Sequence, residues 1–122
     1  METRPFLADT TVFVTTIGDE VNFEDCLAHL DRQTTRFVLE IIDRVAPMSA
    51  ALQEMLERCR TPYYVQVDED MILCPEAIQQ LEYSIRDAPA NTALVCAPLW
   101  DCDCERPIHG VKIYRHAIAK QF

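Results

Sequence analysis

The chain has 122 residues, which is enough for one domain or part of one. Hydrophobic residues make up 49% of it, so it can form an ordinary core and is not a disordered chain. A net charge of −9 disfavours nucleic acid and anionic membranes as partners, because both bind through positive protein charge. Two glycines are too few for a Gly-rich phosphate loop. Any phosphate must therefore be held by a metal, by side chains or by a helix N-terminus.

No apolar run has the length of a membrane span, and the N-terminus shows no basic region followed by an apolar stretch. Six cysteines without a visible secretion signal predict reduced thiols and a cytoplasmic protein. Cys26, Cys59 and Cys96 fall on apolar faces, and we interpret them as small core residues.

Runs of β-branched and apolar residues alternate along the chain with segments of helical periodicity. After a polar lead-in at 1–10, we predict strands at 11–17, 37–42, 63–67, 93–99 and 110–114. Helices are expected from Asn22, as N-cap, to about residue 33, from Pro47, from Pro75, and at 115–122, with a polar loop at 101–107. This alternation predicts an α/β fold with three layers, α/β/α, and a mainly parallel sheet.

Polar residues follow three of the predicted strands at their carboxyl ends, where open parallel sheets bind ligands. Asp68-Glu69-Asp70 follows the strand 63–67, Asp43 follows 37–42, and Gly18-Asp19 follows 11–17. Asp68 and Asp70 are two residues apart and would point the same way on extended backbone. Two such carboxylates suit Mg²⁺ or Mn²⁺ carrying a phosphate group. The alternative interpretation is a solvated acidic turn.

The strand 63–67, its Asp-x-Asp, the apolar triplet 71–73 and the helix opened by Pro75 together resemble the nucleotide-sugar-binding part of a GT-A glycosyltransferase, most similar to the family 2 type. The resemblance covers roughly residues 11–122 and implies a Rossmann-like fold. It implies one domain at 1–122, either whole or a fragment of a longer catalytic domain. The implied activity is metal-dependent transfer of a sugar from a UDP- or GDP-type nucleotide-diphosphate sugar to an acceptor hydroxyl, or the donor-binding part of it.

The resemblance also implies roles for the acids. Asp43 would accept hydrogen bonds from the base or ribose, or else be a surface acid at a strand end. Asp68 would lie near the ribose and the metal-bound phosphates, and Asp70 would be the more direct ligand of Mn²⁺ or Mg²⁺. Glu69 would point to the other side and be structural or solvated.

Other implied positions flank these acids. Thr15, Thr16 and Asp19 would line the loop near the nucleotide, although either threonine is equally compatible with a core-facing hydroxyl. His109 would be a further metal ligand, and the alternative is a loop histidine with no ligand role. Trp100 would stack on a sugar or cap the core.

The sequence departs from the family pattern in two places. Arg44-Val45-Ala46-Pro47 stands where an Asp-rich loop is expected. No convincing catalytic base follows residue 115, although Asp101, Asp103 and Glu105 are acids in the right region. The chain is therefore an excised part, a minimal domain or a non-catalytic relative.

Two alternatives stay open. The first is a non-catalytic nucleotide- or partner-binding module that associates with itself as a homo-oligomer, or with another chain, to cover an exposed sheet edge. The second is a zinc site formed by Cys96, Cys102, Cys104 and His109, for which one Cys-x-Cys pair is weak support.

Overall fold

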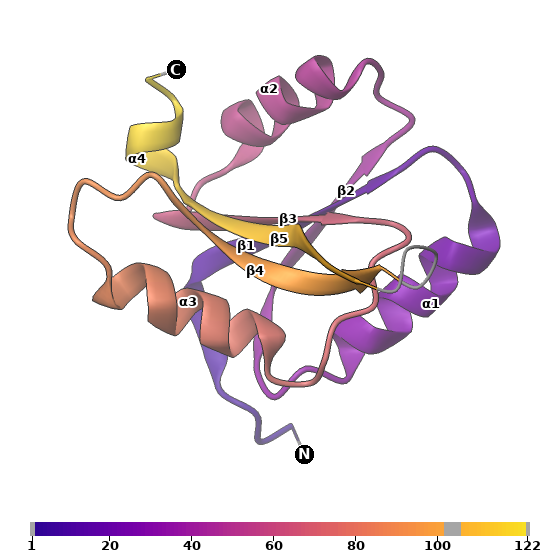
Figure 1. Cartoon of the computed structure of the whole chain (residues 1–122), viewed down its shortest axis with the longest axis horizontal. Helices are drawn as coiled ribbons and strands as arrows, with labels where there is room; N and C mark the ends of the chain where they lie inside the picture. The colour runs from indigo at the N-terminus through magenta and orange to yellow at the C-terminus, as the bar shows by residue number, and fades with distance from the viewer. Residues whose placement is uncertain (1, 102–105, 122) are drawn as a thin grey trace.

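The computed structural model describes residues 2–101 and 106–121, and for 99–101 and 106–109 it describes the backbone only. The described residues form five strands and four helices, which alternate along the chain except that β5 follows β4 directly (Figure 1). Their bounds are β1 (Phe6–Thr16), α1 (Glu20–Asp31), β2 (Arg36–Asp43), α2 (Met48–Arg58), β3 (Tyr63–Asp68), α3 (Ala77–Asp87), β4 (Leu94–Asp101), β5 (Arg106–Arg115) and α4 (His116–Ala119).

The strands form one mixed sheet in the order β2-β1-β3-β5-β4. β1 pairs in parallel with both β2 and β3, and β5 is antiparallel to both β3 and β4. Strands β1 to β4 therefore run in one direction and β5 runs against them. The predicted α/β fold with a mainly parallel sheet is confirmed. However, β4 does not pair with β3, because β5 lies between these two strands and pairs with both.

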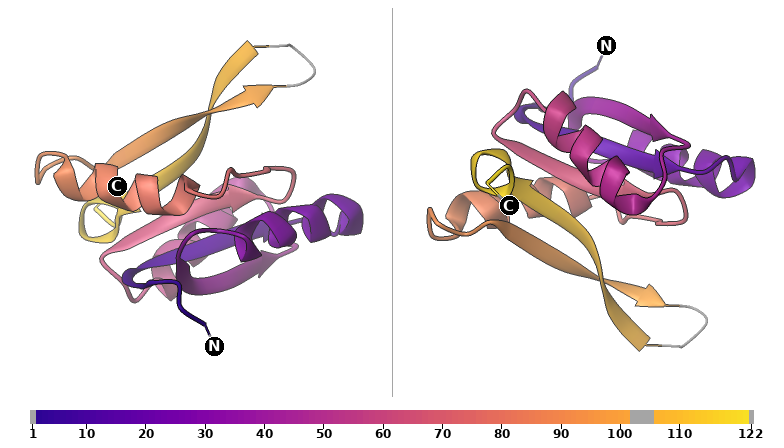
Figure 2. Two further views of the ribbon diagram at one scale, coloured as in Figure 1. Left: turned by 90° about the horizontal axis from the view of Figure 1, so that it is seen from below. Right: turned by 90° about the horizontal axis from the view of Figure 1, so that it is seen from above.

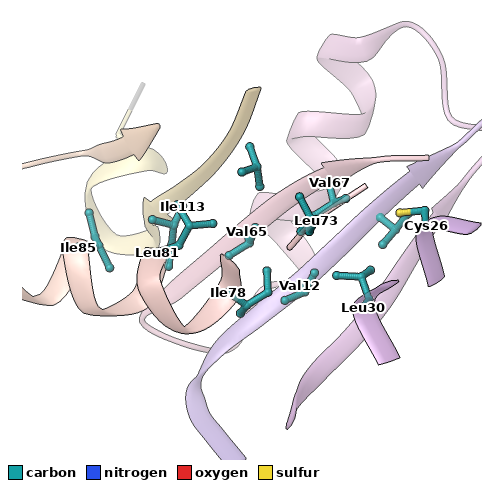
Figure 3. Packing of buried hydrophobic residues seen from close by; sticks show 12 residues of the cluster. Val12, Cys26, Leu30, Val65, Val67, Leu73, Ile78, Leu81, Ile85 and Ile113 are labelled. Atoms are coloured by element: carbon teal, nitrogen blue, oxygen red, sulfur yellow. The ribbon is translucent and has the colours of Figure 1, made fainter. Parts of the chain in front are cut away.

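Helices cover both faces of the sheet, which confirms the three predicted layers (Figure 1). Successive residues of a strand point to opposite faces. Val12 and Val14 of β1 accordingly pack with α1 and α3, in the cluster shown in Figure 3. Phe13 packs on the other face, with Ala51 and Met55 of α2. Burial of these large apolar side chains is the main force that holds the layers together.

Three predicted boundaries are wrong. β1 begins at Phe6 instead of residue 11, because Phe6 and Leu7 pair with the start of β2 and continue the edge of the sheet. Helix α1 begins at Glu20, with Asp19 as its N-cap in place of Asn22. The Asp19 carboxylate accepts a hydrogen bond from the Asn22 backbone N–H at 3.3 Å.

The third boundary concerns the predicted loop at 101–107. β4 extends to Asp101 and β5 begins at Arg106, so both ends of that loop are strand residues. Figure 2 shows this hairpin extending away from the layered part of the molecule. The candidate zinc ligands Cys102 and Cys104 and the candidate acids Asp103 and Glu105 lie outside the described residues.

The described cysteines are Cys26, Cys59, Cys74 and Cys96, and all four are free thiols. Cys26 and Cys59 are core residues as predicted, whereas Cys96 is only half-buried. In the described parts of the chain, no helix is both long and apolar enough to cross a bilayer.

Candidate functional site

The carboxyl ends of β2, β1 and β3 meet at one rim of the sheet. Thr16 of β1 lies beside Asp43 of β2, and Thr15 lies beside Asp68 of β3. Asp43 and Asp68 therefore lie on opposite sides of β1, and their pairing partners on β1 are consecutive residues. Since neighbouring strands are about 4.8 Å apart, the backbones of β2 and β3 are separated by roughly 10 Å. The rim is thus wide enough for an extended ligand to reach both acids.

Asp68 is the last residue of β3, and its side chain is held from β1. The Thr15 hydroxyl donates to Asp68 Oδ1 at 2.8 Å, and the Gln66 amide approaches the same oxygen at 3.4 Å. No described residue hydrogen-bonds Oδ2. Among the described residues, the carboxylate is therefore oriented through Oδ1 alone.

The acidic segment is a turn and not a continuation of the strand. The Met71 N–H donates to the Asp68 carbonyl at 2.9 Å and closes the turn across Glu69 and Asp70. The alternation argument that placed Asp68 and Asp70 on the same side of an extended strand therefore does not apply to Asp70. Its side chain is exposed, and its direction is set by the turn.

Glu69 fastens this turn to β1. Its backbone N–H donates to the Thr15 carbonyl at 3.0 Å, and its buried carboxylate accepts a hydrogen bond from the Thr16 hydroxyl. The Gly18 N–H donates to the same Thr16 oxygen at 3.1 Å. Glu69 is therefore structural, one of the two roles expected for it. The Thr16 hydroxyl, expected near a nucleotide, is engaged from both sides.

The acids of the turn act electrostatically on α1. The pKa of the Cys26 thiol is raised to about 11, mainly by burial and in smaller part by the nearby carboxylates of Asp70, Asp68 and Glu69. Cys26 Sγ lies 3.7 Å from the Asp68 carbonyl oxygen. The three acids of the turn therefore concentrate negative charge at the rim, and this charge acts on Cys26 of α1.

A pocket of about 640 Å³ opens on the same rim, between the loop after β1, helix α1 and the end of β2. Its volume is within the range of small-molecule sites. Apolar side chains of α1 and β2 line it together with polar and charged groups. The principal lining residues are Gly18, Phe23, Leu27, Ile41, Asp43 and Arg44.

Asp43 lines this pocket together with Arg44. Arg44 Nη1 lies 3.1 Å from both carboxylate oxygens of Asp43, and both side chains are more than half exposed. Arg44 has left-handed backbone, φ 54°, stabilised by its N–H donating to the Thr16 carbonyl at 2.8 Å. Asp19, the other predicted nucleotide contact, caps α1, and its second oxygen accepts from the Asn22 side-chain amide at 2.8 Å.

The remaining predicted ligand, His109, belongs to β5, where it pairs with Pro98 of β4. Its side chain and that of Trp100 lie outside the described residues. Among the residues whose side chains are described, 2–98 and 110–121, no group of three or more His, Cys, Asp or Glu side chains converges as a metal site. The acidic turn contributes two candidate ligands, Asp68 and Asp70.

Arg44 lies in this pocket although its position in the sequence indicated only a departure from an acidic loop. The signal that was present is a cation directly after a strand-end acid in a chain of net charge −9.

No protein-family model matches the sequence, and no curated protein matches it. Solved structures do match. The mannosyltransferase PcManGT from Pyrobaculum calidifontis, solved in complex with GDP-Man and Mn²⁺, aligns with a TM-score of 0.66 and 12% identity over 98% of this chain and 47% of its own.

Two further structures align over 93% of this chain, each at 16% identity. They are A197 from STIV, with a TM-score of 0.62 and 68% of its own chain covered, and S. aureus TarS 1–349, with a TM-score of 0.60 and 48% covered. This chain has a GT-A-type glycosyltransferase fold. It spans about half the length of PcManGT and of the TarS chain.

Proposed function

We propose that this GT-A chain binds a nucleotide-diphosphate sugar across the rim and forms the donor-binding part of a metal-dependent glycosyltransferase. The observation that carries the proposal is the register of the three parallel strands. It brings Asp43 and its pocket to one side of β1, and Asp68 with the acidic turn to the other, in a fold shared with a GDP-mannose-binding mannosyltransferase.

The base or ribose of a UDP- or GDP-type donor would occupy the pocket beside Asp43. The carboxylate accepts hydrogen bonds and cannot donate them, so it would bind N–H or hydroxyl groups of the nucleoside. Phe23, Leu27 and Ile41 supply an apolar wall, which such sites use to exclude water from the ligand.

Asp68 and Asp70 would hold Mn²⁺ or Mg²⁺ beside the diphosphate. The donor set fits such a hard cation, because it offers carboxylate oxygens and one of the Asp68 oxygens has no hydrogen bond from a described residue. When bound, the metal would act as a Lewis acid on the departing nucleoside diphosphate. Thr15 fixes the Asp68 carboxylate through Oδ1, and Glu69 ties the turn to β1, so both keep the ligands oriented.

In the complete reaction, an acceptor hydroxyl would attack the sugar carbon as the diphosphate leaves. We assign the donor half of that reaction to this chain. His109 would be a further ligand of the metal, and His109→Ala should then weaken Mn²⁺-dependent nucleotide binding.

The experiment compares Asp70→Ala with Asp87→Ala, an equal loss of charge at an exposed residue ending α3. UDP and GDP are titrated into each protein with and without Mn²⁺. We expect Asp70→Ala to lose the Mn²⁺-dependent part of nucleotide binding while Asp87→Ala keeps it, and both to unfold at the wild-type temperature. Unchanged Mn²⁺-dependent binding by Asp70→Ala would remove Asp70 from the proposal.

A further inference from the structure

Strand β2 forms one edge of the sheet, because it pairs with β1 alone. The N–H groups of Arg36 and Arg44 donate to carbonyls on the β1 side, each at 2.8 Å. Successive N–H groups of a strand point to opposite sides, so the even-numbered residues of β2 bond toward β1. The odd-numbered residues direct their backbone groups to the free edge, where the Ile41 carbonyl accepts from Arg58 Nη1 at 3.1 Å. A further strand can add to such an edge.

The odd-numbered side chains of β2 lie on the α1 face of the sheet and line an apolar groove. Phe37 and Ile41 pack against the core cluster that β2 shares with α1, and Leu39 between them is 41% exposed. Two pockets, of about 480 and 640 Å³, follow this row and adjoin at Leu27 of α1. Together these two pockets form the edge groove. Val38 on the α2 face is 39% exposed, so apolar surface is open on both faces of β2.

The two ends of the edge groove differ in charge. The end at the start of β2 is mainly cationic and is lined by Arg4, Arg36 and Asp31. The end at the rim is mainly acidic and is lined by Glu20, Glu24, Asp43 and Arg44. Of the Arg36 nitrogens in the side chain, only Nε donates to a described residue, the Arg4 carbonyl at 3.2 Å. A two-fold axis across β2 would bring the cationic end of one copy to the acidic end of the other, so this surface is complementary to itself.

Symmetry limits how two copies of β2 can pair. In an antiparallel pair about a two-fold axis, opposite residues share a face of the joined sheet, so odd-numbered residues lie opposite odd-numbered ones. A centre at Leu39 places Leu39 opposite its own copy and Phe37 opposite Ile41, which continues the apolar row. A centre at Glu40 would put two like charges opposite each other, and a centre at Val38 would leave 41–43 outside the paired region. The register centred on Leu39 therefore gives the longest pairing without opposed like charges.

We propose that two copies of this chain form a homodimer by antiparallel pairing of their β2 strands, centred on Leu39. The outward backbone groups of the odd-numbered residues form the ladder between the copies, and the two sheets become one. The Ile41 carbonyl has a second lone pair for this ladder beside its bond from Arg58. The Arg36 guanidinium of each copy then lies toward the acidic end of the other edge groove. This interface needs no nucleotide, so it is independent of the proposed function.

The first test is sedimentation velocity of the wild type, Leu39→Glu and Leu94→Glu at about 0.15 M salt, which screens the repulsion between two acidic chains. Leu94 is the matched control, because it is 40% exposed and lies on β4, the opposite edge strand. We expect the wild type and Leu94→Glu to dimerise. Leu39→Glu places two carboxylates at the axis and should raise the dissociation constant at least about a hundredfold. A monomeric wild type, a dimer that survives Leu39→Glu, or equal weakening by both substitutions would overturn the proposal.

The second test locates the axis without introducing charge into the interface. Opposite residues of a hydrogen-bonded antiparallel pair have Cα atoms about 5.5 Å apart, which a disulfide can span. Leu39→Cys should therefore form a disulfide-linked dimer on oxidation with glutathione, above the background of the wild-type thiols. Glu40→Cys is the control, because its two copies would be diagonal neighbours about 7–8 Å apart, beyond that reach. Preferential cross-linking of Leu39→Cys supports the register, and equal or greater cross-linking of Glu40→Cys would overturn it.

Discussion

Gly18→Ala tests the contact between the two loops of the candidate site. Gly18 has φ +99°, a region that side chains with a Cβ disfavour by about 1–2 kcal/mol. The new Cβ would lie 2.8 Å from Arg44 Nη2, which is too close for the guanidinium to stay in place. Arg44 is 65% exposed and can swing away, so the added cost is the loss of a surface ion pair, about 0–1 kcal/mol. The backbone strain and the lost ion pair together should lower the free energy of unfolding by about 1–3 kcal/mol.

Thermal unfolding followed by circular dichroism measures this change. For a chain of this size, each kcal/mol lowers the midpoint by about 4 °C, so we expect a decrease of about 4–12 °C. The same substitution in an Arg44→Ala background should be less costly by up to about 1 kcal/mol, because the crowded side chain is then absent. A midpoint within about 1 °C of the wild type would refute the backbone argument. Equal costs in both backgrounds would refute the contact with Arg44.

Two further predictions concern the buried residues Thr16 and Cys26, which lie next to the acidic turn. Thr16→Val should lower the free energy of unfolding by about 2–3 kcal/mol in urea titrations, because it leaves the buried Glu69 carboxylate without its hydrogen-bond donor. Thr16→Ser keeps the hydroxyl and should retain most of the stability. Equal losses in the two variants would show that the hydroxyl is unimportant. Cys26 has a pKa of about 11 against an ordinary 9.0, so the folded state holds the proton more tightly. The resulting stability is present below pH 9 and is lost as the pH rises to 11, by up to about 2 kcal/mol after partial solvent screening. Cys26→Ala should lack this part of the decline, and a wild type with the same pH profile as the variant would rule out the thiol as its source.

The parts of the fold that depend on local pattern could be predicted from the sequence. Alternating β-branched runs and amphipathic segments located the strands and helices, and the position of polar residues after strand ends located the rim. The antiparallel insertion of β5 between β3 and β4 could not be predicted in this way. Strand order depends on pairing between distant segments, and β5 has no local feature that distinguishes a neighbour of β3 from an edge strand.

The candidate site, like the fold, could be predicted from the sequence only in part. The sequence indicates which acids gather at the rim, since Asp43 and Asp68 end parallel strands. It does not give the direction of Asp70, because the backbone leaves the strand at Asp68 and the period of two ends there. The left-handed conformation of Arg44 was also not predictable, as a non-glycine residue adopts it only when its surroundings stabilise it, here through the hydrogen bond to Thr16.

The central claim is that the rim binds a nucleoside diphosphate with the help of a divalent cation. Calorimetric titration of UDP and GDP into the folded wild-type protein, with and without Mn²⁺, tests it most directly. We expect saturable binding of at least one of the two nucleotides, and we expect Mn²⁺ to strengthen it. The absence of any Mn²⁺-dependent heat for either nucleotide would contradict it.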